Sequence, residues 1–274
     1  MGLLDNTHAR RAAILICVLA WLMPAASASA GSLQISHSLA LPREVAEPFG
    51  LPVSPIDWGG LVTKWQGVVR KLDDERVQLA LCDGDRERCA SEAALQFLAI
   101  VDTARLREGR ARLGEINRAI NLAIQPMSDL DQFGEIDVWS SPLVTFYRAA
   151  GDCEDYAIAK LVALRMAGIP ADDLRIVVMV DVISGEGHAV AAARLDGHWL
   201  TLDNRHMALV EDVAVRNYRP LFVIDQSGVK RYSHLPLLAN KRGHDAAPAT
   251  AQDPAQPRLT AVGIGSDEGP RLSR

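Results

Sequence analysis

The chain has 274 residues, of which 49% are hydrophobic, and it carries 29 basic and 34 acidic side chains. A slight acidic excess without a basic patch excludes the electrostatic footprint of a nucleic-acid-binding protein. The length is sufficient for one domain with an ordinary hydrophobic core.

The first thirty residues have the pattern of an export signal. Arg10 and Arg11 precede an apolar run from Ala12 to Met23, and small residues follow up to Ala30. The run of twelve residues is shorter than the roughly twenty that cross a bilayer, so cleavage after Ala30 is favoured over an uncleaved anchor. Removing the signal leaves a net charge of 27 − 33 = −6. We expect a periplasmic protein that does not itself span the membrane.

Three cysteines remain once the signal is removed. Cys82 and Cys89 flank a short polar turn, and an oxidising compartment would let them pair, although two reduced cysteines could also pack there as small apolar residues. In both cases Cys153 is the odd thiol. An unpaired thiol in an exported protein suggests a function.

Residues 31–56 are expected to form an extended, proline-spotted lead to a domain at 57–238. Helical periodicity then predicts three helices, namely one capped by Asp57 that runs from Trp58 to Leu79, one from Ser91 past Val101, and one from Leu113 to Ile124. The stripe that contains Trp58 and Trp65 is interpreted as core rather than as a binding surface.

Residues 132–141 have no clear period and lead towards a central helix over 153–167, with Asp152 at its N-cap position. The pattern then changes to that of strands, expected at 174–182, 189–195, 198–203, 221–225 and 229–232. Helices followed by antiparallel strands indicate an α+β fold. From residue 239 the composition is that of a disordered tail.

The Asp196-Gly197 dipeptide predicts a tight hairpin turn. A two-residue turn would place Val190 opposite Asp203 and make His188 the diagonal neighbour of Asp203 on the same face, about 7–8 Å away at the backbone. An imidazole and a carboxylate can bridge that distance. Together with Cys153 these side chains supply a nucleophile, a base and an orienting acid. Taken alone, His188 would be an ordinary loop histidine, and Asp225 is the main rival to Asp203 as the acid.

Three carboxylates, Asp152, Glu154 and Asp155, surround Cys153 in the sequence. The start of a helix favours a thiolate, whereas the carboxylates would repel it and raise the pKa of the thiol. Two compensations are available. Asp152 and Asp155 could cap helix amides, or the carboxylates could hold a hard cation such as calcium. The residues alone leave both open.

The segment Gly-Asp-Cys-Glu-Asp-Tyr-Ala-Ile-Ala-Lys at 151–160, preceded by Asp-Val-Trp at 137–139 and followed by His188 and Leu-Asp-Asn at 202–204, resembles the bacterial transglutaminase-like cysteine proteinases. The resemblance covers roughly residues 58–232. It implies a papain-like or transglutaminase-like core, an exported location and a catalytic triad of Cys153, His188 and Asp203.

The LapG-type periplasmic proteases of that family need calcium and cut large repeat adhesins near the N-terminus at a di-alanine site. An inner-membrane receptor that senses cyclic di-GMP holds them. The resemblance therefore implies an adhesin substrate, such a receptor as partner, and calcium as cofactor with Asp152, Glu154 and Asp155 as ligands.

The expected reaction is endopeptidase cleavage through a thioester acyl-enzyme. The oxyanion would be bound by the backbone amide of Cys153 and by a second donor from the loop at 137–141, where Trp139 is a candidate. A transglutaminase-like acyltransferase or another amidase is the alternative enzyme. The non-enzymatic alternative is a calcium-responsive binding module with a vestigial triad.

Overall fold

The structure is a computed structural model, and it describes residues 46–233. The expected signal peptide, most of the expected lead and the expected tail lie outside these residues. Among residues 46–233, no helix combines the length and the apolar character that a bilayer span requires.

A seven-stranded antiparallel sheet forms half of the fold, with strand order β1-β9-β8-β4-β5-β6-β7. Its strands are β1 (Val53–Ile56), β4 (Leu174–Asp181), β5 (Gly187–Leu195), β6 (His198–Leu202), β7 (Val210–Glu211), β8 (Tyr218–Asp225) and β9 (Gly228–Tyr232). A separate parallel pair joins β2 (Gln125–Pro126) to β3 (Ala150–Gly151).

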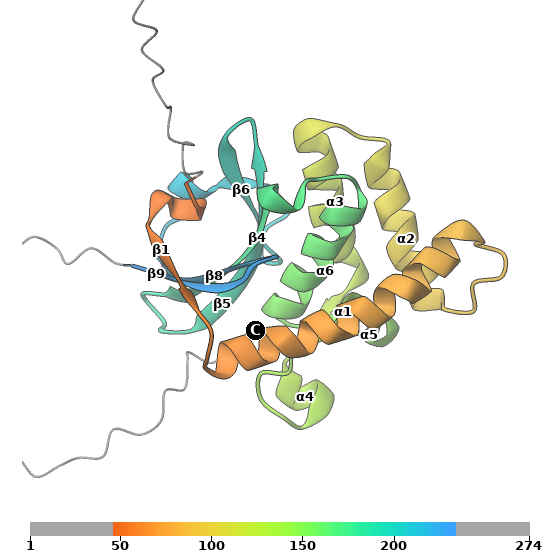
Figure 1. The fold of residues 1–274 in the computed structure, drawn as a ribbon, viewed down its shortest axis with the longest axis horizontal. Helices are drawn as coiled ribbons and strands as arrows, with labels where there is room; N and C mark the ends of the chain where they lie inside the picture. The colour runs from red at the N-terminus through yellow and green to blue at the C-terminus, as the bar shows by residue number, and fades with distance from the viewer. Residues whose placement is uncertain (1–45, 234–274) are drawn as a thin grey trace, which may run out of the picture. The chain divides into compact units, whose positions relative to one another are not determined.

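The helical half comes mostly before the sheet in the chain, and Figure 1 shows the long helices gathered beside the sheet. The helices are α1 (Gly60–Gly84), α2 (Glu92–Arg105), α3 (Gly109–Ala123), α4 (Asp129–Phe133), α5 (Pro142–Arg148) and α6 (Cys153–Met166), with short 3-10 turns at Pro48–Gly50, Ala171–Asp173 and Asp212–Ala214. The expected α+β layout is confirmed.

Helix α6 packs against strand β5, which places three alanines in the shared core. Ala189, Ala191 and Ala193 are buried in the same core cluster as Ile158 and Leu164 of the helix. Alanines let a helix backbone approach a sheet closely, which fixes the start of α6 with respect to β5. The opposite face of the sheet buries a second, smaller cluster.

The predicted hairpin register is confirmed. Leu195 pairs with His198, and Ala191 pairs with Leu202, as a two-residue turn at Asp196-Gly197 requires. The second predicted hairpin is also present, with Asp225 opposite Gly228.

The prediction for the start of the first helix was wrong. Helix α1 begins at Gly60, and the N-cap position is occupied by Gly59, which has φ 114° and makes no side-chain cap hydrogen bond. Asp57 therefore lies two residues before the N-cap position and does not cap the helix. Trp58 therefore lies outside the helix and is 71% exposed, whereas Trp65 is 8% exposed and belongs to the core.

Other boundaries differ from expectation. Helix α3 starts four residues early, at Gly109, and Val53–Ile56, within the expected lead, forms edge strand β1. Helices α4 and α5 occupy a segment where no helix was predicted. Both helices are short, five and seven residues, which is too short for a periodic pattern to reveal them.

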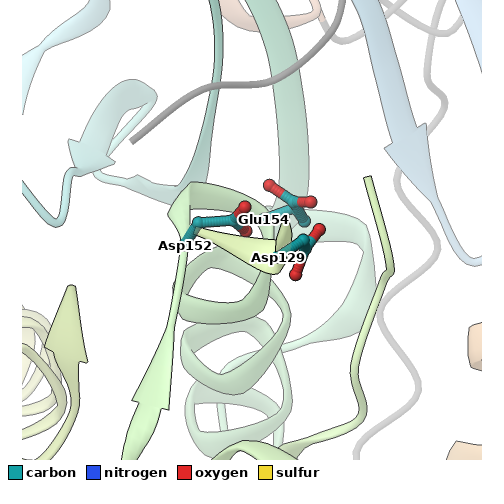
Figure 2. A group of neighbouring side chains, drawn as sticks. All are labelled: Asp129, Asp152 and Glu154. Carbon is teal, nitrogen blue, oxygen red and sulfur yellow. The ribbon is translucent and has the colours of Figure 1, made fainter. Parts of the chain in front are cut away.

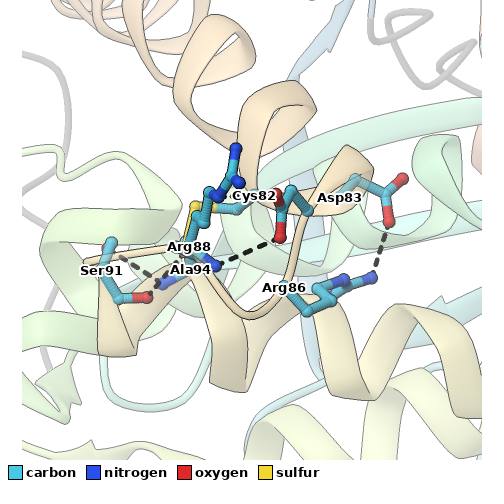
Figure 3. Close-up of a disulfide and its surroundings, with 8 residues drawn as sticks. Cys82, Asp83, Arg86, Arg88, Ser91 and Ala94 are labelled. Atoms are coloured by element: carbon cyan, nitrogen blue, oxygen red, sulfur yellow. Dashed lines mark hydrogen bonds and ion pairs between the residues drawn. A yellow bond between two sulfur atoms is a disulfide. The ribbon is translucent and has the colours of Figure 1, made fainter.

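The predicted disulfide is present. Cys82, near the end of α1, is bonded to Cys89, and Figure 3 shows the loop that the bond closes. Ser91 then caps α2 by accepting a hydrogen bond from the amide of Ala94. Within residues 46–233, Cys153 is the free cysteine, and it is buried.

Candidate active site

The first turn of α6 is held by close packing of the residues around Cys153. A Cβ atom at Gly151 would lie 2.9 Å from Cβ of Asp155 and 3.2 Å from Thr145, so only glycine fits there. The Tyr156 hydroxyl donates a hydrogen bond of 2.5 Å to the carbonyl of Ile124, at the end of α3. These contacts fix the start of α6 and with it the position of Cys153.

The thiol of Cys153 is fully buried and donates a hydrogen bond to Oε2 of Glu154 at 3.3 Å. Burial raises the pKa of this thiol well above its ordinary value, and the charges of Glu154 and Asp152 raise it further. The backbone amide of Ala189 opposes them by hydrogen-bonding the sulfur. Burial and the neighbouring carboxylates thus both favour the protonated thiol.

His188 and Asp203 form a buried hydrogen-bonded pair, with 2.9 Å between Nε2 of His188 and Oδ1 of Asp203. The other ring nitrogen, Nδ1, is buried and has no hydrogen-bond partner among the described residues. His188 immediately precedes Ala189, whose amide contacts the sulfur of Cys153. The backbone at His188 and Ala189 thus lies beside the sulfur, and one nitrogen of the imidazole has no hydrogen-bond partner within residues 46–233.

Asp203 is suited to remain ionised beside the imidazole. Burial alone would raise its pKa, but the hydrogen bond and charge of His188 and the backbone amide of Arg205 outweigh burial, so the pKa lies below its ordinary value. The ring of Tyr218 packs against the His188 ring with 5.5 Å between centroids. The imidazole is therefore held at its edge by Asp203 and on one face by Tyr218.

Asp225, the rival acid, is engaged elsewhere. It forms an ion pair with Lys230 at 2.6 Å and accepts hydrogen bonds from Ser227. Burial would raise its pKa, but these partners lower it overall. Asp225 lies at the end of β8, whereas Asp203 directly follows β6, the strand paired with that of His188.

A cluster of three buried carboxylates, Asp129, Asp152 and Glu154, adjoins the cysteine. Figure 2 shows the three side chains pointing toward one another at the start of α6, and one oxygen from each lies within 4.8 Å of the others. One oxygen of each carboxylate is buried and has no hydrogen-bond partner within residues 46–233. Such an arrangement of oxygens could hold a hard metal ion.

Burial and mutual repulsion raise the pKa values of the carboxyl groups in this cluster. Burial, and then the charge of Asp152, raises the pKa of Asp129 to about 7. Burial also raises the pKa of Asp152 and, more strongly, that of Glu154. Either protons or a cation must compensate these groups at neutral pH.

Of the three carboxylates that the sequence predicts as calcium ligands, two lie in the cluster and one does not. Asp152 and Glu154 belong to the cluster, whereas Asp155 lies outside it and accepts a hydrogen bond of 2.8 Å from the amide of Ser140. Asp152 occupies the N-cap position without making a side-chain cap hydrogen bond, so the capping interpretation was wrong for Asp152. Sequence reasoning missed Asp129, in α4.

The loop before α5 is tied down by carboxylates. The indole N–H of Trp139 donates to Asp137 at 2.9 Å, and the amide of Val138 donates to Asp129. The side chain of Trp139, suggested as a second oxyanion donor, thus already has an acceptor in this state.

A cysteine at the start of a helix, packed on antiparallel strands that carry a hydrogen-bonded His–Asp pair, is the arrangement found in thiol-dependent acyl-transfer enzymes, which include the cysteine proteases. The chain belongs to the bacterial transglutaminase-like cysteine proteinase family, whose model matches residues 77–237. The family expectation is confirmed, and the protein is a cysteine protease.

Solved structures with a similar fold include LapG from Legionella pneumophila, with 21% identity and a TM-score of 0.47 over 57% of this chain and 86% of that one. A calcium-bound structure of the same Legionella pneumophila protein has 22% identity and a TM-score of 0.46 over 53% and 83% of the two chains. A comparison with curated proteins found no match.

Proposed function

We propose that the mature chain is an exported, calcium-dependent cysteine endopeptidase with Cys153, His188 and Asp203 as its catalytic residues. The observation that carries the proposal is the buried His188–Asp203 hydrogen bond, together with a free Nδ1 on the imidazole next to the amide that contacts the thiol. Asp203 occupies Nε2, which leaves Nδ1 as the nitrogen that would receive the proton of the thiol.

The mechanism follows from these positions. Nδ1 of His188 takes the proton of the Cys153 thiol, and the sulfur attacks the carbonyl carbon of the scissile peptide. The backbone amide of Cys153 stabilises the resulting oxyanion. His188 then gives its proton to the leaving amine as the C–N bond breaks, which leaves a thioester. Water, deprotonated by His188, attacks the thioester and releases the acid and the free thiol. Asp203 orients the imidazole throughout.

Asp129, Asp152 and Glu154 would hold the calcium ion, with Asp129 in the place that the sequence had given to Asp155. Three buried carboxylates with unpartnered oxygens match the hard oxygen ligands that calcium takes. A bound calcium ion would supply the positive charge that these carboxylates lack beside the nucleophile.

For the substrate, we propose a large surface adhesin, cut near its N-terminus at a di-alanine site in the periplasm. For regulation, we propose an inner-membrane cyclic di-GMP receptor that holds the protease. Membership of the family, the export pattern of residues 1–30 and the resemblance of the cysteine motif to the LapG-type proteases support these proposals.

The test uses purified residues 31–274 and an N-terminal adhesin fragment that contains an Ala-Ala pair. We expect calcium-dependent cleavage at that pair, inhibition by EGTA, and no cleavage by Cys153→Ala. Cleavage by the Cys153→Ala variant would refute the assigned nucleophile. Incorporation of a labelled amine into the fragment, in place of hydrolysis, would instead identify the acyltransferase alternative.

A further inference from the structure

Lys160 is a buried lysine that the proposed mechanism does not use. It lies on α6, seven residues and thus about two turns after Cys153, on the same side of the helix. Its side chain is 0% exposed. Lysine is almost never fully buried without a paired charge, so its presence here requires a reason.

Lys160 contacts the main chain next to Asp203, the proposed acid of the triad. Its ammonium group donates a hydrogen bond of 3.2 Å to the carbonyl of Leu202, the residue before Asp203. It also lies 5.6 Å from the centre of the Tyr156 ring. None of the ion pairs found within residues 46–233 includes Lys160.

Burial disfavours the charged form of Lys160 and lowers its pKa to about 7, although the nearby charge of Asp203 acts in the opposite direction. A methionine of similar length would fill the same space without this desolvation cost. Packing alone therefore does not account for the lysine. What remains is its polar contact with the end of β6.

The main chain around Asp203 is held from two helices. Lys160 of α6 holds the carbonyl of residue 202, and Asn121 of α3 donates a hydrogen bond of 2.9 Å to the carbonyl of Asp203 itself. The amide of Arg205 donates to Oδ1 of Asp203, also at 2.9 Å. The carboxylate that orients His188 is thus fixed through its backbone as well as through its side chain.

We propose that Lys160 is a positioning residue that fastens the end of β6 to the cysteine-bearing helix and thereby sets Asp203, and through it His188, with respect to Cys153. This inference rests on the proposed triad. It assigns a polar role to the lysine at the end of the cysteine motif, within the same helix as the nucleophile.

The experiment compares Lys160→Met, which removes the donor and keeps the length, with Lys160→Gln, which keeps an uncharged donor. Arg165→Met, at an exposed position of the same helix, is the matched control. Each variant is assayed with calcium for kcat and KM on the adhesin fragment, for alkylation of Cys153 by iodoacetamide, and for Tm.

For Lys160→Met we expect kcat to fall about 10- to 100-fold, because small displacements of catalytic groups have effects of that size, while KM stays within about twofold. Alkylation of Cys153 should slow in parallel, and Tm should stay level or rise. Lys160→Gln should recover part of both rates, and Arg165→Met should match the wild type.

The inference is overturned if Lys160→Met keeps wild-type kcat and alkylation, if its losses accompany a fall in Tm, or if Lys160→Gln is no better than Lys160→Met. The wild-type protein distinguishes a failure of the proposed function from a failure of this inference. Absence of cleavage by the wild type would reject the substrate, whereas the alkylation rates need no substrate and still decide the role of Lys160.

Discussion

Replacing Asp129 by asparagine should change the stability of the protein in opposite ways with and without calcium. Asparagine has nearly the same shape and keeps an oxygen that can accept the hydrogen bond from Val138. It removes one negative charge from a cluster whose carboxylates have raised pKa values. The calcium-free protein should therefore gain stability, and the calcium-bound protein should lose a ligand.

The magnitude follows from the pKa of Asp129, which rises from an ordinary value of 3.8 to about 7, mainly because the group is buried. At about 1.4 kcal/mol for each tenfold change in proton affinity, this difference corresponds to about 4 kcal/mol. Local rearrangement and water entry should reduce the effect to about 2 kcal/mol.

The sign follows from proton binding. Between about pH 4 and pH 7 the folded state holds a proton on Asp129 that the unfolded state has lost, so the free energy of unfolding falls as the pH rises through this window and then levels off. The asparagine side chain of the variant cannot titrate. In EGTA, the variant should match the wild type at pH 4 and melt about 4–8 °C higher at pH 8.

Thermal melts at both pH values, with EGTA or with excess calcium, provide the assay. Calcium at a hundred times its dissociation constant should stabilise the wild type by about 3 kcal/mol and the Asp129→Asn variant by much less. Glu135→Gln, an exposed carboxylate of the same segment, is the control and should behave like the wild type. A lower Tm of Asp129→Asn at pH 8 in EGTA, or an undiminished calcium response, would refute this reasoning.

Two further predictions concern the acid and the disulfide. Asp203→Asn should lower kcat about 10²- to 10⁴-fold. Asp225→Asn should leave kcat within about twofold and lower Tm, because Lys230 loses the closer of its two carboxylate partners, Asp225 and Glu47. Retained kcat in Asp203→Asn together with a loss in Asp225→Asn would reverse the assignment. Replacing Cys82 and Cys89 together by alanine opens a loop with a sequence separation of 7 and should cost about 2 kcal/mol of unfolding free energy, seen in urea melts, without changing kcat. Loss of kcat in the folded double variant would contradict a purely structural bond.

The His188–Asp203 pair could be predicted because its geometry is local. A tight turn fixes the register of two neighbouring strands, so counting outward from Asp196-Gly197 was sufficient to place the two side chains together. Cys153 was found by its motif and by elimination of the paired cysteines. In each case the decisive information lies within a few residues of the site.

Asp129 could not be found in this way. It lies 152 − 129 = 23 residues before Asp152, and it reaches the cluster because the short strands β2 and β3 pair in parallel, with Pro126 opposite Gly151. Pairing over only two residues leaves no pattern in the sequence. The burial of Lys160 was equally hidden, because a lysine on a helix is ordinarily at the surface.

The pairing of β1 with β9 has a consequence for when the enzyme can mature. Ile56 lies opposite Val229, and Figure 1 shows β1 alongside β9. An N-terminal portion of the chain that lacks β9 cannot complete the sheet, because β9, the last strand within residues 46–233, is the partner of β1, the first strand there. For a chain threaded unfolded across a membrane, the protease would assemble only after nearly all of it had emerged, on the side where its substrate is expected.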